Sequence, residues 1–157
     1  MMELENIIIE QTAKTPQIDL NRLTGDLSFY GRSIPENATK LYEPVLNWVA
    51  EYILGANPTT NLRLDLEYFN TASSMYLAKM LKVLSQIKVP EYVLIIHLYI
   101  PIEEFNEINE FADICDTFSP ITDIFHNSTT SISLKLYAKD DRGEIIKTRL
   151  VFIDPNN

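Results

Sequence analysis

The sequence is poor in cysteine, glycine and basic residues, and each shortage excludes a class of protein. One cysteine, Cys115, among 157 residues excludes an internal disulfide framework. Four glycines leave no glycine-rich loop of the kind that cradles a nucleotide phosphate. The 13 basic residues are outnumbered by 22 acidic ones, for a net charge of −9. This balance argues against binding to nucleic acid and to anionic membrane surfaces.

Long hydrophobic runs are also missing. The longest apolar stretch, residues 93–102, is interrupted by His97 and Pro101 and is too short to span a bilayer as a helix. The first ten residues lack the basic region and the apolar run of a secretory signal peptide. We therefore expect a cytoplasmic protein without membrane insertion. An apolar content of 46% over this length is typical of a single globular domain, here residues 1–157.

Residues that usually carry chemistry are few and scattered. His97 and His126 do not have metal-ligand spacing, and we expect His97, inside an apolar strand, to be hydrogen-bonded within the fold. The acidic residues between positions 103 and 110 fall mostly on the wet face of a helix, which favours solvation over a cation site. Cys115 lacks the basic neighbours that stabilise a thiolate and is expected to pack. No catalytic residue, metal or cofactor is predicted.

The first half of the chain combines short strands with a helix. Strands are predicted over residues 6–10, 17–21 and 27–30, the last two as a hairpin. Helical spacing then runs from Pro35 to residue 54, with Gly55 as the stop. Pro44 requires either a turn over residues 36–42 followed by a helix with Pro44 in its first turn, or a kink. Both alternatives place Trp48 inside the protein.

The second half alternates again between strand and helix. A helix is predicted to about Ile87, followed by a nearly all-apolar strand over residues 92–99 that suits a parallel strand covered on both faces. Helical spacing returns over residues 103–115, and residues 131–137 and 145–153 form a C-terminal hairpin. We therefore predict an α/β domain with helices mainly on one face of a mixed sheet, whose central strands are Leu62–Tyr68 and Val93–Tyr99.

An amphipathic strand that runs directly into a hydroxyl-rich helix start is the most informative segment. The helix is predicted to begin at Asn70 or Thr71, where free N–H groups and the positive helix end favour a phosphate. Thr71 is thus a candidate switch, although Asn70, Thr71 and Ser73 would equally serve as a helix cap worth about 1 kcal/mol. The strand residues that share one face at a two-residue period are Leu62, Leu64, Leu66 and Tyr68.

Two motifs and the helix between them occur in a fixed order. The first motif is Gly-Arg-Ser-Ile-Pro-Glu-Asn-Ala at residues 31–38, the helix carries Tyr42, Pro44 and Trp48, and the second motif is Glu-Tyr-Phe-Asn-Thr-Ala-Ser-Ser at residues 67–74. In this combination the chain resembles the SiaC family of bacterial regulatory phosphoproteins, most strongly over residues 15–87. The resemblance implies a STAS-like fold, similar to the antagonists of anti-sigma factors.

The family resemblance implies a partner-switching function. Thr71 would be the phospho-acceptor for a dedicated serine/threonine protein kinase, and a PP2C-type phosphatase would remove the phosphate. The unmodified form would bind and activate a diguanylate cyclase or another signalling target. The residues expected to take part in partner recognition are Arg32, Glu36, Asn37, Glu67, Tyr68, Asn70, Ser73 and Ser74.

Two departures from the family pattern bear on the identity of the partner. The stretch Tyr99–Phe105 is more apolar than the acidic, tyrosine-containing segment usual after the second core strand, and Ile34 replaces an aromatic residue. The C-terminal hairpin from Ser131 onward has no counterpart that we can match. We expect it to replace or add a strand at the edge of the sheet.

Other interpretations of these residues remain open. Glu36 would be ordinary dipole compensation if it lies in the first turn of a helix, and Arg32 would pair either a phosphate or a nearby carboxylate, Glu36 or Asp65. At the level of function, a small-ligand sensor or carrier would use a pocket at the carboxyl ends of the strands, near Tyr68 and Asn70 and close to Tyr99. A small enzyme of unfamiliar type is the remaining alternative.

Overall fold

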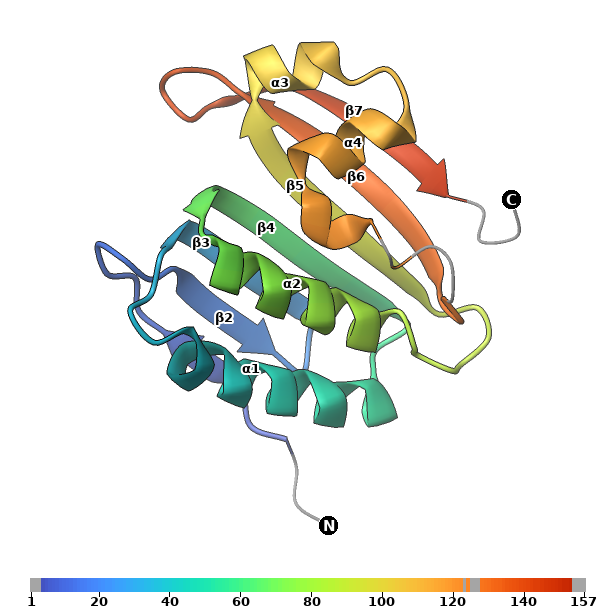
Figure 1. Ribbon diagram of the computed structural model, residues 1–157. Helices are drawn as coiled ribbons and strands as arrows, with labels where there is room; N and C mark the ends of the chain where they lie inside the picture. Colours follow the sequence, from blue (N-terminus) through green and yellow to red (C-terminus); the bar gives the residue numbers. More distant parts are fainter. Residues whose placement is uncertain (1–3, 123, 125–127, 154–157) are drawn as a thin grey trace.

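The fold is built on a seven-stranded sheet in which every strand lies beside its neighbour in the chain (Figure 1). The computed structural model describes residues 4–122, 124 and 128–153. Strands β3 to β6 are parallel to one another, whereas the β1–β2, β2–β3 and β6–β7 pairs are antiparallel, so the predicted mixed sheet is confirmed. The strands are β1 (Ile7–Ile9), β2 (Gln17–Asn21), β3 (Asp26–Ser33), β4 (Thr59–Phe69), β5 (Val93–Pro101), β6 (Ser131–Lys139) and β7 (Ile145–Ile153).

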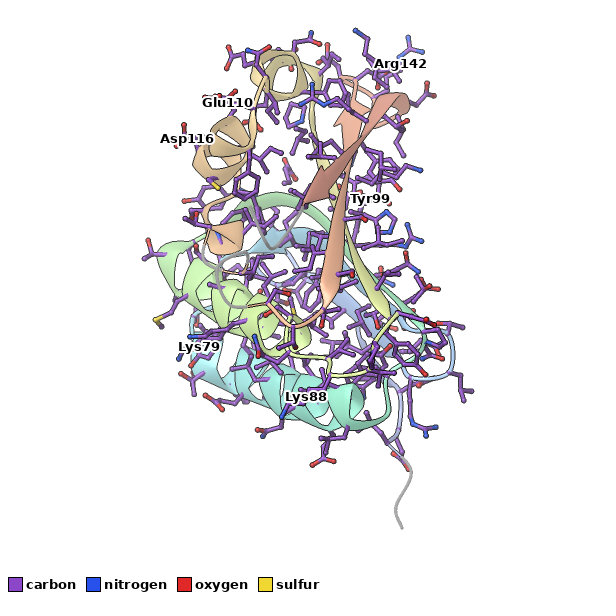
Figure 2. The ribbon with its side chains drawn as sticks, turned by 90° about the vertical axis from the view of Figure 1, so that its right-hand side faces the viewer. Lys79, Lys88, Tyr99, Glu110, Asp116 and Arg142 are labelled. Carbon is purple, nitrogen blue, oxygen red and sulfur yellow. The ribbon has the colours of Figure 1, made fainter. Side chains whose placement is uncertain are left out.

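Helices form the connections between the parallel strands. Each crossover moves to the next strand in the same direction, and right-handed crossovers of this kind place their helices on one side of the sheet. Figure 2 shows α1, α2 and α4 on one side, with Tyr99 projecting from the other. The helical segments are α1 (Ala38–Tyr52), η1 (Ile53–Gly55), α2 (Thr71–Leu84), α3 (Ile102–Glu107), α4 (Phe111–Thr117) and η2 (Ser119–Ile121).

The main core lies between the sheet and the helices. Trp48 of α1 is 4% exposed, as predicted, and its Nε1 donates to the backbone carbonyl of Glu5 at 2.6 Å. Its ring stacks on Tyr52 with centroids 5.2 Å apart. Cys115 is partly buried against the same core. No helix among the described residues is both long and apolar enough to cross a membrane.

Three helix predictions need correction. Pro44 lies inside one continuous helix that begins at Ala38, so the alternative that placed Pro44 in a first turn is wrong. The single helix predicted over residues 103–115 is two short helices, because Ile108 leaves the helical conformation (ψ 113°). Glu110 and Asp113 then form a capping box that starts α4. The helix expected to reach Ile87 ends at Leu84.

The strand predictions hold with three changes. The β2–β3 and β6–β7 hairpins are confirmed, and β7 adds an edge strand to the sheet. Tyr68 does not share the burial of Leu62 and Leu64, since it is 54% exposed near the end of β4. Strand β5 is parallel to both neighbours, but its second face is only partly covered: Ile95 and Tyr99 are half-buried there. β3 also extends beyond the predicted Tyr30, to Ser33.

Candidate functional site

Thr71 lies at the junction between β4 and α2, with its side chain exposed. Asn70 is the N-cap of α2, and its side-chain Oδ1 accepts a hydrogen bond from the Ser73 N–H at 2.9 Å. Thr71 is the first residue of the helix, which is one of the two predicted starts. Within the described part of the chain, the N–H groups of Thr71 and Ala72 meet no acceptor, which is usual for the first turn of a helix. The hydroxyl is therefore accessible beside a positive helix end.

The start of α1 lies at the same edge of the sheet as the start of α2 (Figure 1). Asn37 is the N-cap of α1 and accepts from the Lys40 N–H at 3.1 Å. Because β3 and β4 are adjacent and parallel, the helices that follow them begin side by side. Thr39 Oγ1 and the Tyr76 hydroxyl, 2.8 Å apart, connect the two helices. The surface around Thr71 thus includes the starts of two neighbouring helices that a side-chain hydrogen bond connects.

A buried hydroxyl cluster supports this surface from below. Ser33 Oγ lies 2.7 Å from Ser73 Oγ and 2.5 Å from the Tyr42 hydroxyl. The carbonyl of Ser33 also accepts from the Asn70 N–H at 2.9 Å and from Ser73 Oγ at 3.0 Å. Burial raises the pKa of Tyr42, so its hydroxyl stays protonated. The cluster fixes the end of β3 to the first turn of α2.

Ser73 is a correction to the predicted recognition residues. Its side chain is fully buried in this cluster, so it supports the surface and does not face a partner. The sequence pattern identified a hydroxyl-rich helix start but not which hydroxyl points inward. That depends on the contact with Ser33, which lies 40 positions away in the sequence.

Arg32 and Glu36 lie at the end of β3 and in the loop that follows it. The strand register shifts between Gly31 and Arg32, where Gly31 adopts φ 115°, a conformation that glycine tolerates best. Arg32 consequently pairs with Tyr68 in the β3–β4 ladder, and both side chains are exposed. Arg32 forms no ion pair with the described residues.

The carboxylates suggested as partners of Arg32 are engaged elsewhere. Glu36 pairs with Lys14 at 2.9 Å, and this ammonium lowers the pKa of Glu36. Glu36 also precedes the N-cap of α1, so the alternative that placed it in the first turn of the helix is wrong. Asp65 pairs with Lys139 at 2.8 Å. Neither carboxylate pairs with Arg32 in the part of the chain that the structure describes.

The remaining predicted residues lie on the strand and the helix that flank Thr71. Glu67 is exposed near the end of β4. Ser74 is half-buried, and its Oγ lies 3.5 Å from Ser119 Oγ in η2. Most of the predicted recognition residues therefore lie at one edge of the sheet, since Arg32, Asn37 and Tyr68 lie there too.

The cap of α2 yields a stability prediction. Asn70→Ala removes the acceptor for the Ser73 N–H and should lower the free energy of unfolding by about 1 kcal/mol. Asn70→Asp keeps an acceptor and should change it by less than about 0.5 kcal/mol. The matched control is Asn47→Ala on the exposed face of α1. Urea unfolding measures the difference, and equal stabilities of the two alanine variants would show that the cap contributes nothing.

A groove opens beside the last residues of β4 because β4 and β5 separate. Their ladder ends at the Leu64–Leu98 pair, although β4 continues to Phe69 and β5 to Pro101. The space between them has a volume of about 620 Å³, and Tyr68 and Tyr99 lie among its walls. We call it the β4–β5 groove. Six of its lining residues are acidic: Asp65, Glu67, Glu103, Glu104, Asp140 and Asp141.

His97 occupies the sheet face opposite the helices and is hydrogen-bonded inside the fold, as predicted. Its Nε2 lies 2.8 Å from Asn61 Oδ1 and its Nδ1 lies 2.7 Å from the Tyr137 hydroxyl. Asn61 Oδ1 only accepts, so Nε2 carries the hydrogen. Burial, helped by the charges of Arg63 and Lys135, lowers the pKa of His97 to about 4. The ring is therefore neutral at pH 7 and structural in role.

The lowered pKa predicts a loss of stability in acid. In the unfolded chain the histidine has its ordinary pKa of 6.5, so below that pH the unfolded state takes up a proton that the folded state does not. Stability should fall as the pH drops from about 6.5 towards about 4, by about 1.5 kcal/mol between pH 6.5 and pH 5. Urea unfolding at several pH values measures this. His97→Gln should flatten the dependence in that interval, and an unchanged slope would contradict the assignment.

Other candidate chemistry is not assembled in the described part of the chain. No group of three or more histidine, cysteine, aspartate or glutamate residues is placed to hold a metal ion there. The exposed acidic residues Glu103, Glu104 and Glu107 of α3 and Glu110 before α4 face solvent. His126, the second histidine of the sequence, lies outside the described residues.

Three residues of the site were not identified as functional from the sequence. Lys14 contacts Glu36 across a loop, and Ser33 and Tyr42 form the buried cluster with Ser73. Ser33 and Tyr42 do lie within the motif region of residues 31–48, and that position was a sequence feature that could have identified them. No sequence feature pointed to Lys14, because its contact with Glu36 depends on the β1–β2 connection folding against the end of β3.

Comparison with known proteins supports the fold and the motifs. The family model described as SiaC family regulatory phosphoprotein matches residues 9–132. An uncharacterized protein of Pseudomonas aeruginosa strain UCBPP-PA14 is 31% identical over 83 residues, which are 53% of this chain and 66% of that protein. The chain thus spans just under two thirds of the length of this relative.

Solved structures share the fold. The crystal structure of apo-SiaC from Pseudomonas aeruginosa has a TM-score of 0.63 at 22% identity, covering 83% of this chain and 98% of that one. A further structure from the same organism, of diguanylate cyclase SiaD in complex with its activator SiaC, has a TM-score of 0.63 at 22% identity and covers 83% and 99%. At this identity the likeness establishes the fold. The family model ends at residue 132, before most of β6 and all of β7.

Proposed function

We propose, because this chain belongs to the SiaC family of regulatory phosphoproteins, that it is a non-enzymatic signalling adaptor switched by phosphorylation of Thr71. A serine/threonine protein kinase adds the phosphate and a PP2C-type phosphatase removes it. The unmodified form binds and activates a target, and a diguanylate cyclase is the first candidate because SiaC is the activator of the cyclase SiaD in a solved complex. Relatedness to STAS domains and a cytoplasmic location are parts of the same proposal.

The observation that carries the proposal is the exposed hydroxyl of Thr71 at the N-terminus of α2. A phosphate there adds about −1.5 to −2 charges and three acceptor oxygens. The unpaired N–H groups of the first turn favour this charge locally, and Arg32 has no carboxylate partner among the described residues that would compete for it. An acidic partner surface would be repelled, and an apolar one would have to strip the phosphate of water at a cost in free energy. One modification thus separates two binding states without refolding the domain.

The recognition surface is proposed to consist of exposed and half-buried residues at this edge of the sheet. Asn37 and Asn70 also cap their helices, so their contribution to binding would come from the side of the amide that the cap leaves free. Ser73 is excluded by its burial. The members of the proposed surface are Arg32, Glu36, Asn37, Glu67, Tyr68, Asn70, Thr71 and Ser74.

Mass spectrometry after incubation with the cognate kinase and ATP tests this function. One phosphate should be added, on the peptide that contains Thr71. Phosphate on another residue would show that Thr71 is not the phospho-acceptor. No phosphate at all would contradict control of this protein by phosphorylation.

A second candidate function is supported by the β4–β5 groove. A small-ligand sensor would need a concave site at the carboxyl ends of the strands, and the groove has the required volume and includes Tyr68 and Tyr99. Asn70, which we expected in this pocket, is not among its lining residues. A metabolite that binds the folded protein here would raise its melting temperature. The adaptor is favoured because the family match includes the Thr71 motif.

A further inference from the structure

The β4–β5 groove combines three properties that suit a protein segment. Its floor is apolar, with Phe69 packed edge-on against Phe118 at 5.3 Å between ring centroids. Its rim is strongly acidic. Its two long walls are strand edges that face the groove without a ladder between them. Residues 65, 66, 68 and 69 of β4 pair only with β3, and residues 99–101 of β5 pair only with β6.

Open strand edges favour an extended peptide. Unpaired main-chain N–H and C=O groups along a strand are a ready template for another strand, and this mode of binding takes its affinity from the main chain and its specificity from side-chain pockets. The groove therefore fits an extended chain better than a compact ligand.

The charges of the groove indicate the side chains of its occupant. Four carboxylates of the rim, those of Glu67, Glu103, Glu104 and Asp141, are exposed and form no ion pair with the described residues. The one basic residue among the described residues that line the groove shows how a cation is held there. Lys139 Nζ lies 2.8 Å from Asp65 Oδ1 and 5.9 Å from the centre of the Tyr30 ring. A carboxylate beside an aromatic face is a favourable place for an ammonium or a guanidinium group.

We propose that the β4–β5 groove is the docking site for an extended, arginine- or lysine-bearing segment of the partner that engages the phosphorylated form. The choice of partner follows from the sign of the charge that phosphorylation adds. Phosphate on Thr71 adds negative charge three residues beyond Tyr68, a lining residue, so it strengthens the attraction for a basic segment. The partner that removes the phosphate meets this requirement, whereas a target released by phosphorylation does not. Only this choice of partner rests on the proposed function.

The test uses the full chain and two labelled synthetic peptides of alternating residues, one of arginine and valine and one of glutamate and valine. Fluorescence anisotropy at low ionic strength measures binding, and amide chemical shifts locate it. The arginine peptide should bind, with shifts concentrated in residues 65–69 and in residues 99 and 100, and the glutamate peptide should not. Phosphorylated protein should bind the arginine peptide at least as tightly as unmodified protein does.

Matched charge variants separate docking in the groove from general attraction to an acidic protein. Glu103→Gln with Glu104→Gln should weaken the arginine peptide about fivefold, since each exposed charge contributes up to about 1 kcal/mol. Glu43→Gln with Glu51→Gln removes the same charge from the exposed face of α1, outside the groove, and should change the affinity less than about twofold.

Three results would overturn the proposal: equal weakening by both pairs of substitutions, shifts outside the groove, or spermidine binding as tightly as the peptide. None of these results bears on the proposal that Thr71 is phosphorylated, because peptide binding is measured first on unmodified protein. Conversely, if the protein is not phosphorylated by the kinase but binds the peptide in the groove, the phosphorylation proposal is wrong and the docking proposal stands.

Discussion

Phosphorylation of Thr71 is expected to weaken the complex with the activated target about a hundredfold. A factor of this size corresponds to about 2.7 kcal/mol. A doubly charged group at an interface that accommodates a neutral hydroxyl must lose its water or push the two surfaces apart. Leaving one charged group unpaired at an interface costs about 2–5 kcal/mol. The exposed position of Thr71 between two helix ends places the phosphate in contact with anything docked over this surface.

Isothermal titration of the target cyclase with unmodified and with fully phosphorylated protein measures the effect. Thr71→Glu, which adds one charge and a different shape, should reproduce part of it. The control is Thr148→Glu on the exposed edge strand β7, which introduces the same charge away from the proposed surface and should leave the affinity nearly unchanged. A target that binds both phosphorylation states equally would contradict the proposed switch.

Removal of the Thr71 hydroxyl is expected to abolish phosphorylation while leaving the fold intact. The side chain of Thr71 is exposed and makes no hydrogen bond to the described residues, and alanine is a good helix former. Thr71→Ala should therefore melt within a few degrees of the wild type, and intact-mass spectrometry after kinase treatment should find no added phosphate.

Neighbouring hydroxyls provide the controls for that experiment. Thr71→Ser keeps an acceptor and should restore modification. Ser74→Ala removes a hydroxyl one turn further along α2 and should still accept one phosphate. Full phosphorylation of Thr71→Ala would show that the phospho-acceptor is another residue. Loss of phosphorylation in Ser74→Ala as well would indicate that the kinase recognises Ser74 in addition to Thr71.

Local periodicity was sufficient to predict the elements that build this edge of the sheet. The alternating pattern of β4, the start of α2 at Thr71 and the buried Trp48 of α1 follow from residues close in sequence, where strand and helix spacing differ clearly. The same reasoning failed over residues 103–115, because the helical spacing there continues through Ile108 while a capping box restarts the helix after it. A capping signal competes with periodicity, and in this segment it prevails.

The properties of individual site residues depend on contacts between distant parts of the chain. Ser73 is buried where Ser33 lies beneath it. Among the described residues, Glu36 and Asp65 pair with Lys14 and Lys139, and neither pairs with Arg32. The β4–β5 groove exists because two strands separate beyond Leu64. None of these contacts has a local signature, so the sequence indicated where the site would be but not which of its side chains are accessible.

One measurement tests the acceptor and its effect on binding together. The protein is phosphorylated to half occupancy by its kinase and passed over the immobilised target cyclase, and the phosphate is located by fragmentation in the retained and unretained fractions. Phospho-Thr71 should be found almost entirely in the unretained fraction, with unmodified protein retained. An equal distribution of phospho-Thr71 between the two fractions would contradict control of docking by this residue.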